Sequence, residues 1–185
     1  MFAFLDIETS WQQSITVIGV YRPGVGTRQL VAPRITRDAL LELVDGVEIV
    51  FTYNGGRFDL PVIAAHVGVD LARRHAHRDL MFDCWKHDLK GGLKKVEQRL
   101  GIHRDTEGVD GLQAMNLWAN HRRHLRIAPP PRPLAEDFPS RLPADACCEA
   151  LEFLLRYNRE DCENLEILAQ KLGVFDALRA AADGR

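Results

Sequence analysis

The order of the apolar segments in the first third of the chain restricts the fold more than any other feature of the sequence. Short β-branched runs, bounded by turn residues, predict strands at 1–5, 15–21, 29–32 and 47–53. Gly24 and Gly26 mark a hairpin turn between the second and third of these runs, and Thr36 caps an amphipathic helix before the fourth. Strands interleaved with helices in this way predict an α/β domain.

The rest of the chain reads mostly as helix. Apolar periodicity predicts helices at 58–67, 92–100, 112–125 and 143–172, with a last short strand at 80–83. Six of the nine prolines fall within 128–143, which predicts a stiff extended loop. The flanks of this loop are too short to form separate domains, so we expect a single domain over residues 1–185.

Composition and charge exclude several classes of protein. At 46% hydrophobic and 27% charged residues, the chain can bury a core and is not a disordered tail or a disulfide miniprotein. Lys and Arg number 24 against 26 Asp and Glu, so nucleic acid would have to be held locally or through bound metal cations. The four cysteines form no CxxC pair, which favours reduced thiols. Without an apolar run of about 18 residues, we expect a soluble cytoplasmic protein with no membrane partner.

The first predicted strand ends in two acidic residues. Asp6 and Glu8 lie two residues apart, so strand alternation places both side chains on one face. Two like charges in a buried position repel each other, and a cation between them stabilises the pair. The alternative is a solvated strand end, which an isolated pair of acids at this spacing cannot exclude.

Two further segments carry acidic residues beside apolar elements. The glycines of 54–59 (NGGRFD) allow a tight turn from strand to helix, which places Asp59 in the first helical turn. In 157–161 (YNRED), Tyr157 and Asp161 are four residues apart and therefore lie on the same face of a helix. Each segment alone has an ordinary explanation, because acids are common at helix starts and on helix surfaces.

Taken together and in this order, the three segments resemble the DEDD superfamily of 3′–5′ exonucleases. The residues that match its acidic motif are Asp6, Glu8, Asp59 and Asp161. Tyr157 matches the tyrosine (DEDDy) subgroup, whereas Arg156 stands where a histidine-type member would carry histidine. The stretches 93–102 (LKKVEQRLGI) and 157–165 (YNREDCENL) look like those of bacterial YprB-type ribonuclease-H-like domains, and the resemblance extends over residues 4–172.

This resemblance implies a fold and an activity. The fold would be a ribonuclease-H-like mixed five-stranded sheet flanked by helices, with Asp6 and Glu8 on the central strand. The activity would be metal-dependent hydrolysis from the free 3′ end of single-stranded DNA or RNA, with release of nucleoside 5′-monophosphates. Two divalent cations, Mg²⁺ or Mn²⁺, would be the cofactors, since hard oxygen ligands select such ions.

The resemblance also implies roles for individual residues. Asp6, Glu8 and Asp161 would hold the metal beside the attacking water, and Asp6 would also contact a second metal that Asp59 supports. Tyr157 would orient the attacking water by a hydrogen bond, because a free tyrosine ionises only near pH ~10. The candidate substrate contacts are Thr9, Asn54 and Phe58.

Several alternatives remain open at this point. The same motifs fit a ribonuclease that processes RNA 3′ ends, whereas a non-catalytic nucleic-acid-binding module would be expected to have lost a carboxylate. The basic run 121–126 could hold a nucleic-acid backbone or form a solvated helix end, and Trp11 could stack on a base or fill the edge of the core. A zinc site at His75, His77, Cys84 and His87 is not favoured, because structural sites usually show two tight ligand pairs across a defined loop and a predicted strand intervenes here. A protein partner that supplies specificity is also open.

Overall fold

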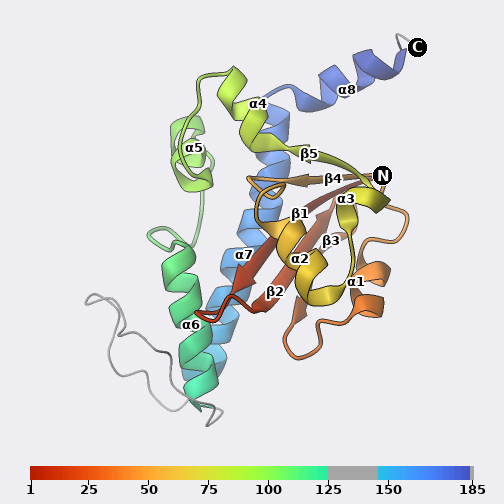
Figure 1. Ribbon diagram of the computed structural model, residues 1–185. Coiled ribbons are helices and arrows are strands. Elements are labelled where there is room, and N and C mark those ends of the chain that lie inside the picture. Colours follow the sequence, from red (N-terminus) through yellow and green to blue (C-terminus); the bar gives the residue numbers. More distant parts are fainter. Residues whose placement is uncertain (125–145, 184–185) are drawn as a thin grey trace.

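The computed structural model describes residues 1–124 and 146–183, and the predicted proline-rich loop at 128–143 lies outside them. The strands in these ranges are β1 (Phe2–Thr9), β2 (Ile15–Arg22), β3 (Gly26–Val31), β4 (Ile49–Thr52) and β5 (Ala76–Asp79). The helices are α1 (Arg37–Leu43), α2 (Asp59–Val67), α3 (Leu71–Arg74), α4 (Leu80–Lys86), α5 (Leu93–Leu100), α6 (Gly111–His124), α7 (Ala146–Lys171) and α8 (Val174–Asp183). Figure 1 shows their arrangement.

The five strands form one mixed sheet in the order β3-β2-β1-β4-β5. β1 pairs antiparallel with β2 and parallel with β4, so the first strand of the sequence is the central strand of the sheet. This arrangement confirms the predicted mixed five-stranded α/β fold, in which the two acids of the first segment lie on the central strand.

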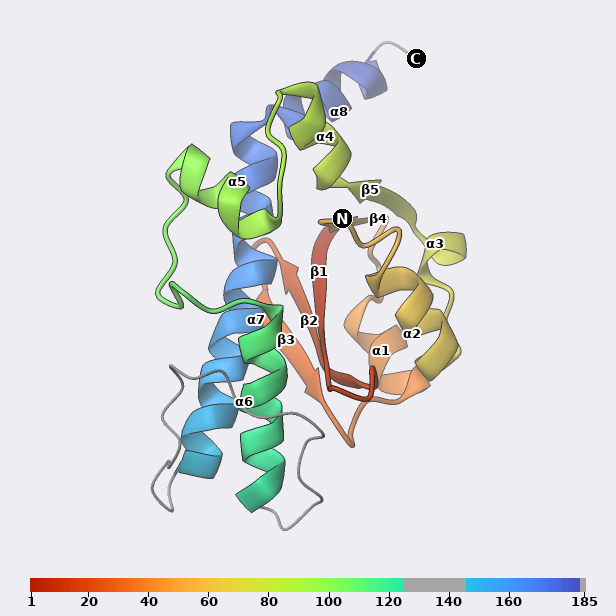
Figure 2. The same ribbon diagram turned by 60° about the vertical axis from the view of Figure 1, so that its left-hand side comes forward.

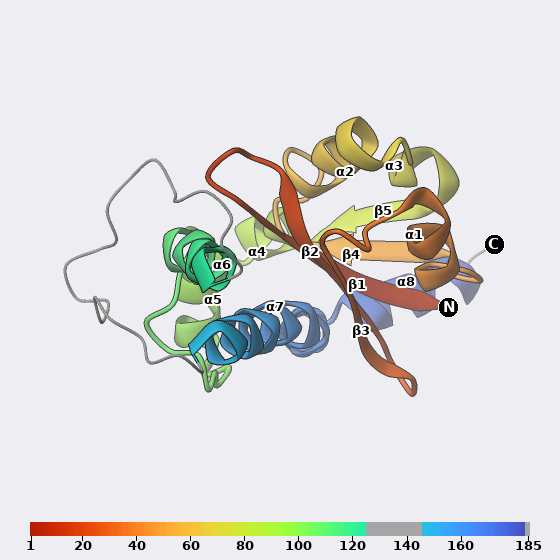
Figure 3. The same cartoon turned by 90° about the horizontal axis from the view of Figure 1, so that it is seen from below.

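Helices cover both faces of the sheet, as Figures 2 and 3 show. Alternate residues of β1 point to opposite faces: Leu5 and Ile7 join a core with α1, α2 and α3, whereas Phe4 joins a core with α4, α5, α7 and α8. α6 packs lengthwise against α7 through a third apolar cluster that includes Trp118 and Leu154. Period-two alternation of β1 therefore places Asp6 and Glu8, like Phe4, on the α7 side.

The structure differs from the sequence-based expectation in the region around Asp79. The predicted strand at 80–83 is wrong: β5 ends at Asp79, and α4 begins at Leu80. The Asp79 carboxylate accepts a hydrogen bond from the Met81 N–H at 3.1 Å, and this cap starts the helix where the apolar run had suggested a strand. The short helix α3 and the helix α8 were not predicted.

Candidate active site

The two acids of β1 lie at its C-terminal end, beneath α7. Asp6 is partly exposed, and Glu8 is buried with 6% of its surface accessible. The pairing with β2 shifts register between Glu8 and Thr9, the last residue of the strand. Both acids therefore lie within the regular part of the ladder, and the irregular pairing follows directly after them.

Helix α7 brings Tyr157 and Asp161 over these carboxylates. Both side chains are 4% exposed and lie one helical turn apart, as their spacing predicted. Asn158, on the same helix, donates hydrogen bonds from Nδ2 to the Asp6 side chain (Oδ2, 2.9 Å) and backbone carbonyl (3.3 Å). α7 is thus joined directly to the central strand at the site.

The close approach of α7 to the sheet depends on Gly19 of β2, which is paired with Asp6 across the β1–β2 ladder. A Cβ atom at this position would lie 2.2 Å from Asn158 Oδ1 and 2.7 Å from Cys162 Sγ. Gln29 Nε2 donates to the same Asn158 oxygen at 2.9 Å. A side chain at Gly19 would therefore push away the amide that holds Asp6.

Asp59 enters from the opposite side of the site, in the first turn of α2. Its Oδ1 accepts a hydrogen bond from the Ile7 N–H at 3.1 Å, which fixes this carboxyl group beside the backbone between the two acids of β1. The preceding turn is tight, as the glycines predicted: a Cβ on Gly55 would lie 2.4 Å from Thr52. Asp79 holds this turn by accepting the Asn54 N–H at 2.7 Å.

The eight residues predicted for the site all line a single hollow of about 290 Å³; they are Asp6, Glu8, Thr9, Asn54, Phe58, Asp59, Tyr157 and Asp161. Oxygen atoms from Asp6, Glu8 and Asp161, one from each, lie within 4.8 Å of one another. In residues 1–124 and 146–183 this is the one group of acids, histidines or cysteines close enough to hold a metal ion, and it does not include Asp59.

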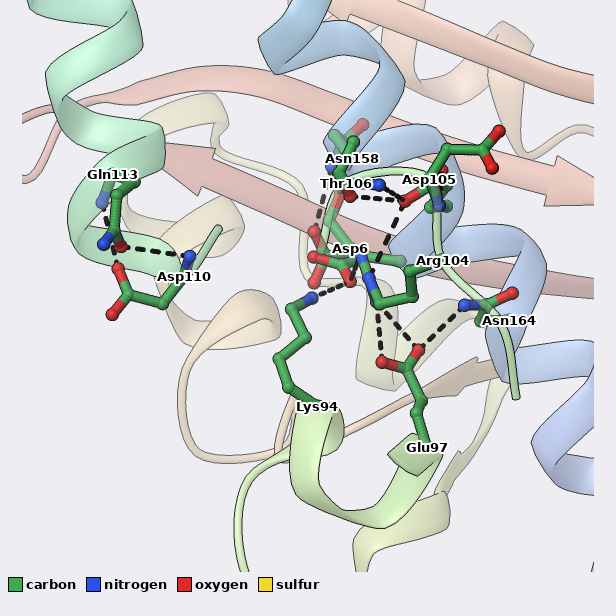
Figure 4. Close-up of polar contacts among 12 residues, drawn as sticks. Asp6, Lys94, Glu97, Arg104, Asp105, Thr106, Asp110, Gln113, Asn158 and Asn164 are labelled. Atoms are coloured by element: carbon green, nitrogen blue, oxygen red, sulfur yellow. Dashed lines mark hydrogen bonds and ion pairs between the residues drawn. The ribbon is translucent and has the colours of Figure 1, made fainter. Parts of the chain in front are cut away.

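Two basic side chains, which sequence reasoning did not assign to the site, contact the carboxylate of Asp161. Lys94 of α5 forms an ion pair with Asp161 Oδ1, and its ammonium lies 4.3 Å from the centre of the Tyr157 ring. Arg104 Nη2 lies 2.7 Å from the same oxygen. Figure 4 shows Lys94, on α5, and Arg104, on the loop that follows this helix, both close to Asp6. They offset part of the negative charge of the site.

Arg104 is itself held in place by a buried network. Its Nη1 donates to both carboxylate oxygens of Glu97 at 2.8 Å, and Asn164 Nδ2 donates to Glu97 Oε1 at 3.0 Å (Figure 4). Glu160 accepts the backbone N–H groups of Asp105 and Thr106, next to Arg104 in the chain. The guanidinium is therefore fixed by contacts with α5 and α7 before it reaches Asp161.

Burial and crowding change the acidity of these groups. Burial raises the pKa of Asp6 and Glu8 well above the usual range, and the neighbouring carboxylate of Asp161 raises both further. Burial also raises the pKa of Asp59 to about 7. For Tyr157, burial raises the hydroxyl pKa well above its ordinary value, and Asp161 adds to this effect. Burial and mutual repulsion therefore favour the protonated forms of Asp6, Glu8 and Asp59, and a bound cation would favour the ionised forms. Their hard oxygen donors fit Mg²⁺ or Mn²⁺.

Other residues considered from the sequence do not gather at a site. His75 Nδ1 lies 2.8 Å from the Val47 carbonyl, His77 Nε2 lies 2.9 Å from Thr52 Oγ1, and Cys84 is buried in the core. Cys84 and Cys162 are free thiols, as expected. Of the basic run 121–126, the last part lies outside the described residues. Over the described part of the chain, none of the helices has the length and apolar character needed to cross a membrane.

The sequence contained a weak signal for Lys94 and Arg104. Both fall in or near the stretch 93–102, but a basic residue on a short helix is usually solvated, and nothing in the spacing indicates which acid it meets. Asn158 lies inside the 157–161 motif, yet its contact with Asp6 depends on the absence of a side chain at Gly19. These three roles arise from tertiary contacts, which local patterns do not encode.

The chain resembles a known family in sequence pattern and a solved structure in fold. The family model for the RNase_H superfamily matches residues 3–173. No curated protein sequence is significantly similar to the chain. Among solved structures, the family B DNA polymerase from the hyperthermophilic archaeon Pyrobaculum calidifontis is similar, with a TM-score of 0.64 and 17% sequence identity. The match covers 92% of this chain and 24% of the polymerase chain, and at this identity it shows a shared fold.

Proposed function

The chain belongs to the RNase_H superfamily, and from this premise we propose that it is a metal-dependent 3′–5′ exonuclease of the DEDDy type. It would remove nucleoside 5′-monophosphates from single-stranded nucleic acid. The observation that carries the proposal is the approach of Asp6, Glu8 and Asp161 to within 4.8 Å of one another. Asp59 and Tyr157 line the same hollow, so the five residues of the exonuclease motif meet at one place.

The acids of this hollow would hold two divalent cations, Mg²⁺ or Mn²⁺. The first cation would be bound by Asp6, Glu8 and Asp161. The second cation would be bound by Asp6, with the support of Asp59. Cations bound there would activate the attacking water and neutralise charge on the scissile phosphate. The raised pKa values of Asp6 and Glu8 support this assignment, since burial and the neighbouring carboxylate of Asp161 disfavour their ionised forms, which a bound cation would stabilise.

Tyr157 would position the attacking water. Because its pKa lies well above the usual value, the hydroxyl stays protonated at neutral pH and cannot act as a phenolate base. It can instead form a hydrogen bond to water and hold it in line with the phosphate. Arg104 would keep the Asp161 carboxylate in a fixed orientation, and Asn158 would do the same for Asp6.

The rim of the hollow would contact the terminal nucleotide. Phe58 is 45% exposed, which is unusual for a large apolar side chain beside buried carboxylates. An exposed aromatic face at this position suits stacking with a base of the substrate. A base in a single strand is free to stack on it, whereas a base in a duplex is already paired and stacked. Thr9 and Asn54 would contact the sugar and phosphate from either side.

The proposal is tested by the direction and the metal dependence of cleavage. A 5′-labelled single strand, supplied as DNA and as RNA, should shorten stepwise from its 3′ end with Mg²⁺ or Mn²⁺. EDTA should abolish the reaction, and either cation should restore it. A 3′-phosphate should slow cleavage sharply, because it blocks the end that the site must accept. Cleavage of a closed single-stranded circle, or full activity in excess EDTA, would contradict the proposal.

A further inference from the structure

A second hollow of about 360 Å³ adjoins the candidate active site. Its walls come from the loop between β1 and β2 and from the side of α6 that faces the sheet, and the residues that matter here are Ser10, Trp11, Thr16, Trp118, Ala119 and Arg122. The loop has a defined shape, since the Ser10 backbone N–H donates to the Ser14 carbonyl at 2.8 Å. In Figure 3 the loop at the end of β1 and the helix α6 lie close to each other.

The two hollows are lined by neighbouring residues of the same two segments, the end of β1 with its following loop and the helix α6. Thr9, at the end of β1, lines the active-site hollow, and the next residues of the chain line the second. On α6, Met115 lines the first hollow, whereas Trp118 and Arg122 line the second. Steps of three and four residues keep these side chains on one helix face, so the second hollow continues the first along α6.

The chemistry of the second hollow suits a nucleobase. Two indole rings contribute to its walls, and the Arg122 guanidinium lies 5.8 Å from the centre of the Trp118 ring. Thr16 is 1% exposed, and its hydroxyl has no hydrogen-bond partner among the residues that the structure describes. Aromatic rings and arginine planes stack on bases, and a buried hydroxyl can both donate to and accept from a base edge.

We propose that this hollow is a nucleobase subsite, which binds a base of the substrate strand on the 5′ side of the scissile bond. This inference rests on the proposed nuclease function. Met115 is separated from Trp118 and Arg122 by about 5–10 Å along the helix axis. Stacked bases of one strand are about 3.4 Å apart, so the bound base belongs to one of the three nucleotides that precede the terminal one.

Binding of single-stranded octanucleotides tests the subsite. Asp161→Asn protein, which should not cleave, is titrated with a 5′-labelled strand that carries an abasic residue at the second, third or fourth position from the 3′ end. We expect an abasic residue in at least one of these positions to weaken binding about tenfold. Trp11→Ala and Arg122→Gln should each weaken binding of the intact strand, and should have little further effect on that abasic strand.

Matched controls separate this effect from general charge and packing. Arg123 is exposed on the same helix and does not line the hollow, so Arg123→Gln should leave the affinity unchanged. Trp85→Ala, at an exposed indole of α4, is the control for Trp11→Ala. If Trp11→Ala does not fold, Arg122→Gln still decides the question. Equal losses for intact and abasic strands, or losses no larger than those of the controls, would overturn the subsite.

The outcomes for the subsite and for the nuclease are distinguishable. Base-dependent binding by a wild-type protein that never shortens the strand would contradict the nuclease and leave the subsite standing. Conversely, Trp11→Ala and Arg122→Gln proteins that shorten the strand with the kcat/KM of the wild type would overturn the subsite and leave the nuclease standing. With both proposals correct, the two variants should raise KM about tenfold while kcat changes little.

Discussion

Asp6 and Asp161 are two acids of the same site, but their charges are balanced differently. Asp161 contacts two cations, Lys94 and Arg104, whereas Asp6 accepts a hydrogen bond from the neutral amide of Asn158. Neutralising Asp161 would therefore remove the ion-pair partner of Lys94 and one of the anionic partners of Arg104. Neutralising Asp6 would relieve repulsion and leave the ion pairs of Asp161 in place.

This difference gives the first prediction, which concerns Asp6→Asn. The substitution keeps the shape of the side chain and removes charge that bound cations need, so cleavage should slow by about 10³-fold or more. The melting temperature in EDTA should stay level or rise, while Asp161→Asn should show no such gain. Single-turnover cleavage and calorimetry measure the two effects. Near-normal turnover of Asp6→Asn would remove this residue from the catalytic set.

The second prediction concerns the hydroxyl of Tyr157. Tyr157→Phe keeps the ring, which packs in the cluster between α6 and α7, and removes one polar group from a water-poor site. A single positioned hydrogen bond there is worth about 2–4 kcal/mol, so kcat should fall about 10²–10³-fold with KM almost unchanged. Single-turnover rates at saturating Mg²⁺, measured across the neutral pH range, check this. Unchanged rates at every pH would make Tyr157 a packing residue.

At the residue scale, the sequence was informative about acids and less so about their partners. Asp6 and Glu8 could be placed on one face because strand alternation is a local rule. Helix periodicity is also a local rule, and it placed Tyr157 and Asp161 on one face of a helix. The ion pairs of Lys94 and Arg104 join segments far apart in the chain. Nothing local to either basic residue specifies which acid it meets.

At the scale of elements, the contact between α7 and β2 controls the site through Gly19. Gly19→Ala would place a methyl group 2.2 Å from Asn158 Oδ1, so the helix or the amide must move. We expect a loss of about 1–3 kcal/mol in the free energy of unfolding, as for other overpacked interiors, together with slower cleavage because Asp6 loses its amide partner. Urea unfolding and single-turnover rates measure both effects.

Gly111→Ala is the matched control for stability. Nothing lies within 4 Å of a Cβ at Gly111, which begins α6, and alanine favours helix over glycine. This variant should keep or gain stability. If Gly19→Ala were as stable as Gly111→Ala, the close approach of α7 to the sheet would not be the constraint described above.

The elements themselves were largely predictable, with exceptions that have a physical cause. Thr36 caps α1 as expected, because its hydroxyl accepts the Ala39 N–H at 3.2 Å. The prediction of a strand at 80–83 was wrong because the Asp79 side chain caps a helix there, although the residues that follow it are apolar. α3 spans only Leu71–Arg74, and a helix this short has too few turns to produce a periodic pattern.

At the scale of the whole molecule, the acids of the site connect stability to pH. The pKa of Asp59 rises to about 7 in the folded protein from an ordinary 3.8, and those of Asp6 and Glu8 are also raised. Above the ordinary values the folded state therefore binds more protons than the unfolded state, and its stability falls as pH rises through the folded pKa values. His77 acts in the opposite direction below its ordinary value of 6.5, since burial lowers its pKa.

The fourth prediction follows for the range above pH 6.5, where His77 becomes neutral in both states as pH rises. In EDTA, the free energy of unfolding should drop by about 1–3 kcal/mol between roughly pH 6.5 and 8. Mg²⁺ should reduce this drop, because bound cations favour the ionised acids. Asp59→Asn should also reduce the drop, because asparagine does not ionise. The substitution should keep the local structure, since the asparagine oxygen can still accept the Ile7 N–H. Urea titrations at the two pH values measure the drop, and a metal-free stability that rises over this range would contradict the assignment.

The central strand that carries Asp6 is the first element of the described chain, whereas Asp161 arrives on the last long helix. Asp161 is therefore synthesised long after Asp6. The sheet order places β1 between strands that are made after it, so the central strand gains its neighbours only as synthesis proceeds. The three acids that approach within 4.8 Å of one another can therefore meet only after α7 has emerged and docked on β1.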